Sequence, residues 1–123
     1  MALFPTFVAM EDNIKYHRHV FICTNQRASD APRPSCGEQT GMALVAAFKK
    51  AIKDKKLDIR VRAQRAGCLD LCEHGPTVVV YPEAVFYGNV SLADVEEIVD
   101  QHIVSGNPVQ RLRLKFDKAG EIV

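Results

Sequence analysis

Four cysteines are the feature that most restricts what this chain can fold into. They follow the spacing C-x12-C, a gap of 31 residues and then C-x3-C, at Cys23, Cys36, Cys68 and Cys72. Each falls at the end of an expected strand or in a loop, so we expect one end of one sheet to bring them together. Four thiolates at such a place can supply the ligand shell of an iron–sulfur cluster or of a zinc ion.

The expected cell compartment limits what these thiols can do. The first ten residues are mildly apolar but have no basic segment before them, Pro5 interrupts them, and Glu11 and Asp12 follow at once, which makes a poor signal peptide. The longest apolar runs fall far short of a membrane span. We therefore expect a cytoplasmic protein, in which cysteines are more often metal ligands or catalytic thiols than structural disulfides.

Size and charge narrow the function further. A chain of 123 residues suits one domain, and its hydrophobic fraction of 47% and charged fraction of 25% are typical of soluble globular proteins. The formal net charge of +1 gives no bulk attraction to nucleic acid or to an anionic membrane. Any electrostatic docking has to come from local patches.

Three arrangements of the thiols compete. A thioredoxin-type redox pair needs C-x-x-C at a strand-to-helix junction, and the sequence has no such pair. The stronger alternative to an iron–sulfur cluster is a four-cysteine zinc site, because zinc also binds four thiolates. Structural zinc sites usually draw on two closely spaced cysteine pairs, and only Cys68 and Cys72 approach that spacing. The spacing therefore favours an iron–sulfur cluster over zinc.

The first half of the chain predicts a strand, a helix and a strand. His19–Cys23 is a short apolar run rich in β-forming residues and predicts a buried strand. A helix is expected from Cys36 onwards, with lysines on its outer face. Its apolar residues recur at intervals of three and four: Met42, Val45, Phe48 and Ile52. Residues 58–63 alternate in hydrophobicity and predict a half-buried strand, and residues 64–75 predict a loop that carries the second cysteine pair.

The second half predicts a hairpin and a second helix. Thr77–Tyr81 is the strongest strand of the chain, and Ala84–Tyr87 follows it closely enough to form a hairpin. Ser91 starts a helix, with Asp94 completing a capping box. The apolar stripe of this helix is Leu92, Val95, Ile98, Val99 and Ile103. Residues 106–108, Gly-Asn-Pro, end it.

The predicted order is strand–helix–strand followed by strand–strand–helix. The first unit is a crossover that favours a parallel pair, and the second is an antiparallel hairpin that leads into a helix. This is the core plan of an α/β thioredoxin-like domain, with a mixed four- to five-stranded sheet flanked by two main helices. We place the domain at residues 17–108, after an N-terminal arm of residues 1–16. The C-terminal tail, residues 109–123, fits a late strand or an extended arm.

Four segments carry a more specific pattern. They are residues 19–25 (HVFICTN), Cys36 with Gly37, residues 66–72 (AGCLDLC) and residues 73–82 (EHGPTVVVYP). Together they resemble the thioredoxin-like 2Fe–2S ferredoxins, which are relatives of the small cluster-bearing subunit of respiratory NADH dehydrogenase. The resemblance runs from His19 to Val104, and the long first cysteine gap is similar to that of the free-standing ferredoxins rather than of the enzyme subunits.

The resemblance implies one 2Fe–2S cluster per chain, with Cys23, Cys36, Cys68 and Cys72 as ligands. It implies a low-potential one-electron carrier between redox proteins, rather than an enzyme, and a homodimer. Three apolar residues would serve the dimer contact: Phe86, Tyr87 and Val90. Two other functions stay open, a four-cysteine zinc-binding structural module and a cluster-bearing subunit of a larger NADH-linked oxidoreductase. The lack of a flavin- or dinucleotide-binding segment weighs against the second, and a thioredoxin-like reductase fits least.

The residues near the cysteines suit a buried anion. The glycines among them would let backbone N–H groups approach: Gly37, Gly41, Gly67 and Gly75. The helix that begins near Cys36 would point its positive end at the cluster. His74 is expected to be a polar loop residue rather than a ligand, and Arg27 and Arg33 are candidates to contact an acidic redox partner. Pro76 can adopt either peptide isomer.

Overall fold

The computed structural model describes residues 13–24, 38–67 and 75–123, and its elements follow the predicted order. The strands are β1 (Arg18–Cys23), β2 (Val61–Ala66), β3 (Val78–Tyr81) and β4 (Val85–Tyr87). The first helix is α2 (Glu38–Lys55). The second helical segment consists of a 3-10 turn (Leu92–Asp94), α3 (Val95–Glu97) and π-helical turns (Ile98–Val104), and a last 3-10 turn covers Gln110–Leu112. No helix in these ranges is long and apolar enough to cross a membrane.

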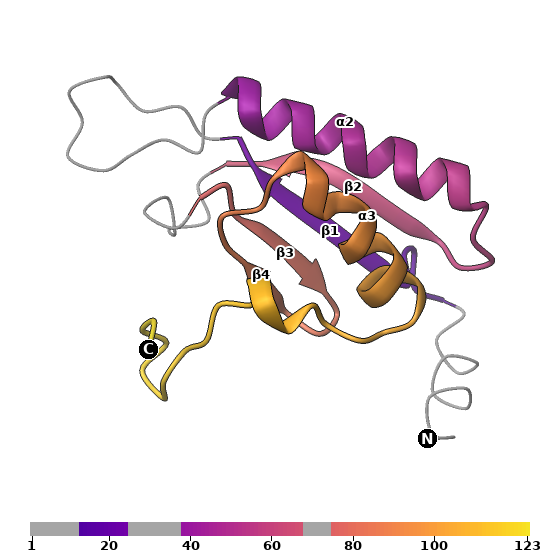
Figure 1. The fold of residues 1–123 in the computed structure, drawn as a ribbon. Coiled ribbons are helices and arrows are strands. Elements are labelled where there is room, and N and C mark those ends of the chain that lie inside the picture. Colours follow the sequence, from indigo (N-terminus) through magenta and orange to yellow (C-terminus); the bar gives the residue numbers. More distant parts are fainter. Residues whose placement is uncertain (1–12, 25–37, 68–74) are drawn as a thin grey trace.

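The four strands form one mixed sheet in the order β2-β1-β3-β4 (Figure 1). β1 and β2 are parallel, and their register places Cys23 opposite Ala66. β3 is antiparallel to β1, and β4 is antiparallel to β3. Because α2 connects two parallel strands, the first half is a crossover unit, and the second half is a hairpin followed by a helix. The predicted element order and mixed sheet are confirmed.

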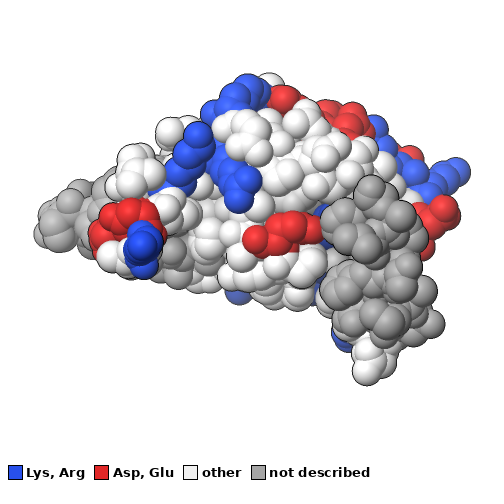
Figure 2. All heavy atoms as spheres, turned by 90° about the horizontal axis from the view of Figure 1, so that it is seen from below, with Lys and Arg blue, Asp and Glu red and all other residues white. Residues whose placement is uncertain are grey.

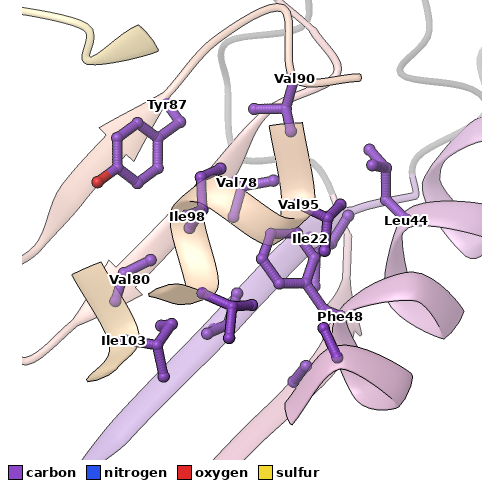
Figure 3. Packing of buried hydrophobic residues seen from close by; sticks show 14 of the residues in the cluster. Ile22, Leu44, Phe48, Val78, Val80, Tyr87, Val90, Val95, Ile98 and Ile103 are labelled. Atoms are coloured by element: carbon purple, nitrogen blue, oxygen red, sulfur yellow. The ribbon is translucent and has the colours of Figure 1, made fainter. Parts of the chain in front are cut away.

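The core lies between the sheet and the two helices, which pack side by side over one face (Figures 1 and 3). Alternate strand residues point to this face, because successive side chains of a strand alternate between its two faces. The largest buried side chains of this layer include Ile22, Leu44, Phe48, Tyr87, Ile98 and Ile103. Full burial of such a side chain stabilises a fold by roughly 1.5–3 kcal/mol, so this layer is a main source of hydrophobic stabilisation.

Two residues that the sequence assigned to apolar helix stripes face solvent instead. The side chain of Met42 is 38% exposed and that of Leu92 is 58% exposed. The buried stripe of α2 is centred on Leu44, Val45 and Phe48, and Met42 lies roughly a third of a turn away from it. Leu92 belongs to the 3-10 turn before α3, whose three-residue period changes the direction of the side chain. The prediction that both are core residues was wrong.

The strand β2 begins and ends three residues later than predicted. Residues 64–66, which the sequence placed in a loop, pair with the last three residues of β1. The polar side chain of Gln64 is accommodated on the sheet face that the helices leave open. There its Oε1 accepts hydrogen bonds from His19 Nε2 at 2.8 Å and from Arg62 Nε at 3.0 Å. Pairing with β1 thus outweighs the local polarity of the segment.

A buried polar chain joins the hairpin, the second helix and the C-terminal residues. The Tyr87 hydroxyl accepts a hydrogen bond from Val109 N–H at 2.9 Å and lies 2.7 Å from His102 Nδ1. His102 Nε2 lies 3.1 Å from the carboxylate of Glu83, which also pairs with Arg18 at 3.0 Å. With Nε2–H donating to Glu83, Nδ1 is left to accept from the tyrosine hydroxyl. His102 is fully buried and is a structural residue.

Part of the predicted tail packs along β4. Leu114 N–H donates to Phe86 O at 2.8 Å, and Gly88 N–H donates to Leu112 O at 3.1 Å. The ring of Phe116 packs edge-on against that of Phe86, with 5.6 Å between centroids. These contacts extend the edge of the sheet beyond β4 without forming a regular strand.

Candidate metal centre

Cys23 ends β1, and its side chain has no exposed surface. Its N–H donates to Thr77 O at 3.0 Å. The next residue, Thr24, donates twice to Ala66 O, from N–H at 3.0 Å and from Oγ1 at 3.1 Å. These bonds tie the end of β1 to the end of β2 and to the residues that lead into β3. The peptide bond before Pro76, an isomer that the sequence left open, is cis.

The first turn of α2 packs directly on the end of β1. A Cβ atom added to Gly41 would lie 2.5 Å from Cys23 O and 2.8 Å from Thr24 Cγ2, distances that real Cβ atoms do not show. Only glycine permits this approach. The N-terminal end of α2, which carries the positive end of the helix dipole, therefore lies beside Cys23. For Gly67, by contrast, no described residue lies within 4 Å of an added Cβ.

Most of the other residues that the sequence assigned to the site lie outside the described part of the chain: Arg27, Arg33, Cys36, Gly37, Cys68, Cys72 and His74. The described residues that flank them lie at the Cys23 end of the sheet (Figure 1). α2 begins two residues after the second cysteine, and β2 ends two residues before the third. Thr77 follows the fourth cysteine by five residues. This is the end of the sheet at which the sequence predicts the four cysteines to gather, and their gathering stays a prediction.

The histidines in the described ranges are engaged elsewhere. His17 Nδ1 accepts the N–H of Arg60 at 3.0 Å, His19 Nε2 donates to Gln64, and His102 belongs to the buried polar chain. Among residues 13–24, 38–67 and 75–123, no group of three or more His, Cys, Asp and Glu side chains is placed to hold a metal ion. A metal at the Cys23 end would therefore need cysteines from the two other cysteine-bearing segments.

Known proteins resemble this chain in both sequence and fold. No family model matches the chain. The chain is 40% identical over 96 residues to a 2Fe-2S ferredoxin of Clostridium pasteurianum, covering 78% of this chain and 94% of that protein. It is also 40% identical over 102 residues to a 2Fe-2S ferredoxin of Aquifex aeolicus (strain VF5), covering 82% of this chain and 92% of the relative.

The solved structure of the wild-type thioredoxin-like [2Fe-2S] ferredoxin from Aquifex aeolicus matches this fold with a TM-score of 0.74 and 38% identity, over 80% of this chain and 96% of that one. Two single variants of the same Aquifex protein have also been solved. Each has serine in place of one cysteine, and the two positions are four residues apart. Cys68 and Cys72 have that separation here. The fold is thus thioredoxin-like, as predicted. The chain belongs to the 2Fe–2S ferredoxin family.

Proposed function

We propose that Cys23, Cys36, Cys68 and Cys72 bind one 2Fe–2S cluster per chain, and that the protein carries single electrons between redox enzymes. One observation carries the proposal: Cys23 is buried at the end of the sheet where both other cysteine-bearing segments are anchored, in a chain 40% identical to two 2Fe–2S ferredoxins. Four thiolates are the usual ligand set of such a cluster.

The residues around Cys23 suit a buried anion. A cluster with four thiolate ligands is negatively charged, and it supplies a site that accepts and releases one electron. The N-terminal end of α2 beside Cys23 favours negative charge, and Gly41 permits its close approach. Because the side chain of Cys23 is fully buried, water has no access to this thiolate.

We expect a low reduction potential. Ligation by four thiolates predicts a value nearer the roughly −400 mV of plant-type ferredoxins than the about −150 to +300 mV of centres with two histidine ligands. The hydrogen bonds that engage His17, His19 and His102 elsewhere support a ligand set without imidazole.

The test is an absorption spectrum of protein purified without air, recorded before and after dithionite, with iron and sulfide assayed on the same sample. We expect a red-brown protein with two irons and two sulfides per chain that bleaches in part on reduction. Cys72→Ser should shift the spectrum and the potential, because serine supplies an oxygen ligand, and unchanged properties would remove Cys72 from the site. A colourless protein that contains zinc would refute the proposal and favour the structural zinc module.

We also propose a homodimer that forms through the sheet face left open by the helices. Two of the three contact residues suggested by the sequence do not serve, since Tyr87 and Val90 are 0% and 1% exposed and lie in the core (Figure 3). The open face instead carries an aromatic row. The rings of His19 and Phe21 stack at 4.2 Å, and Phe21 meets Tyr81 edge-on at 6.0 Å. Aromatic residues are enriched at protein interfaces, which supports this face.

Sedimentation velocity tests the dimer. Tyr81→Lys, at a side chain 40% exposed on the open face, should yield monomers. Val104→Lys is the matched control, because Val104 is 47% exposed but lies on the second helical segment. A wild-type monomer, or equal dissociation of both variants, would refute the open face as the contact.

We place the protein in the cytoplasm, where reducing conditions keep thiols available as ligands. Its partners would then be redox proteins that exchange one electron with it. Cell fractionation tests the compartment. Stoichiometric co-purification with a larger NADH-linked oxidoreductase would instead make the chain a subunit of that enzyme.

A further inference from the structure

A groove of about 360 Å³ lies between α2 and the edge strand β2. Its lining residues are Tyr16, Lys49, Ile52, Lys53, Val61, Arg62 and Ala63. The aliphatic side chains give the groove an apolar part. Three cations and no carboxylate belong to its lining, so the groove is apolar and positively charged at once.

The positive charge of the groove is not neutralised within the described ranges. The side chains of Lys49 and Lys53 are exposed, and neither ammonium group forms an ion pair or a hydrogen bond among the described residues. Arg62 donates to the side-chain oxygen of a glutamine, which is neutral. Lys50, on the same helix but outside the groove, differs, because it pairs with Asp54 at 2.7 Å.

The surface on the β4 side of the molecule differs from the groove in how its charges are distributed. In Figure 2, which views it from below, charged side chains form separate spots among uncharged surface. Two arginines outside the groove have carboxylate partners: Arg111 lies 2.7 Å from Asp94, and Arg18 lies 3.0 Å from Glu83. Since the formal net charge of the chain is only +1, the positive potential of the groove is local.

The groove lies against the strand pair that ends at the candidate metal centre. The groove extends from Val61, which pairs with Arg18 at the start of β1, to Ala63, which pairs with Val20, three residues before Cys23. At the rise of a strand, that is about 10 Å along the chain. A protein bound in the groove would therefore lie beside the two strands that lead to this centre.

We propose that this groove docks an acidic surface loop of the redox partner protein. The inference rests on the proposed function, because the partner is the protein that gives or takes the electron. Carboxylates of the loop would pair with Lys49 and Lys53, and an apolar side chain of the loop would cover Ile52 and Val61. An apolar patch with charged residues at its rim is the composition of a protein interface. Hydrated, flexible lysines speed encounter more than they strengthen binding, which suits a carrier that must also release its partner.

The test measures electron transfer from the dithionite-reduced protein to two oxidised probe proteins of opposite charge, an acidic rubredoxin and a basic cytochrome c, by stopped flow. The test variant is Lys49→Glu with Lys53→Glu. The control is Lys50→Glu with Lys118→Glu, which changes the net charge equally at exposed lysines outside the groove. At low ionic strength we expect the test variant to reduce rubredoxin roughly tenfold more slowly than wild type, with the difference lost in about 0.5 M salt. The control should stay within about twofold of wild type, and neither variant should slow the reduction of cytochrome c.

An unchanged rubredoxin rate in the test variant, or an equal fall in the control, overturns the proposal. The double variant Glu11→Gln with Asp12→Asn gives a second check. If it reduces rubredoxin faster than wild type while the lysine variant has no effect, the groove binds this acidic pair of the chain itself, and the proposal is overturned. Binding to phosphatidylserine vesicles that depends on Lys49 and Lys53, with unchanged rates of rubredoxin reduction, would also overturn the proposal.

If the protein has no cluster, the proposed function is refuted, but the docking site in the groove can still be tested by peptide binding. A fluorescent peptide of Asp, Glu and Leu should still bind wild type and the control, and should bind the test variant roughly tenfold more weakly. Equal binding to all three proteins overturns the docking site.

Discussion

Gly41→Ala tests the packing that positions Cys23. The added methyl group would lie 2.5 Å from Cys23 O and 2.9 Å from Thr24 Cα, so α2 and the end of β1 would have to move apart by several tenths of an ångström. Overpacking of this kind costs about 1–3 kcal/mol. The better helix propensity of alanine offsets about 1 kcal/mol of it. Because both contacts are with backbone atoms, which cannot rotate away, we expect a net loss of about 1–2 kcal/mol.

Urea denaturation of wild type and variant measures this loss, and the absorption spectrum and reduction potential report whether Cys23 has moved. Gly67→Ala is the matched control, because no described residue lies within 4 Å of the added Cβ. We expect Gly67→Ala to keep wild-type stability. The reasoning is refuted if Gly41→Ala is as stable as wild type with an unchanged spectrum, or if both variants lose the same stability.

Three further substitutions test the fold. Tyr87→Phe leaves the buried Val109 N–H without its acceptor, so the free energy of unfolding should fall by about 1–3 kcal/mol; an unchanged urea midpoint would contradict this. Burial raises the pKa of Asp94, but hydrogen bonds from Ser91 and Arg111 outweigh it and hold the pKa below its usual value. Asp94 therefore stabilises the fold above its unfolded-state pKa of about 4, and this contribution is lost as the pH falls through the lower folded-state pKa. Asp94→Asn should flatten the acid decline of stability in urea titrations, and an unchanged slope would count against the assignment. Leu92→Gln should change the free energy of unfolding by less than about 0.5 kcal/mol, and a larger loss would return Leu92 to the core.

The local pattern of the sequence was enough to predict the order of the elements and much of the core. A buried strand, an amphipathic helix and a capping box each depend on residues that are close together in the sequence. The capping box between Ser91 and Asp94 forms as predicted, and Val95, Ile98 and Ile103 are buried as predicted. The four cysteines likewise identified the candidate centre, because their spacing and neighbouring segments are a property of the sequence itself.

Only the tertiary structure decided which neighbours these residues meet. Tyr87 and Val90 are apolar enough for an interface, yet they face the helices and are buried. His102 carries a metal-binding side chain, yet Tyr87 and Glu83 engage both of its ring nitrogens. No local pattern contains this information, because each partner comes from another segment of the chain.

The end of the sheet at Cys23 shows the same division. The sequence by itself determined that Cys23 closes a strand and that glycines lie near the cysteines. The tertiary structure decided that Gly41 meets the Cys23 carbonyl and that β2 reaches Ala66, three residues beyond its predicted end. The physical reason is that periodicity determines which face of an element is apolar, whereas register and close approach are set by contacts between segments far apart in the sequence.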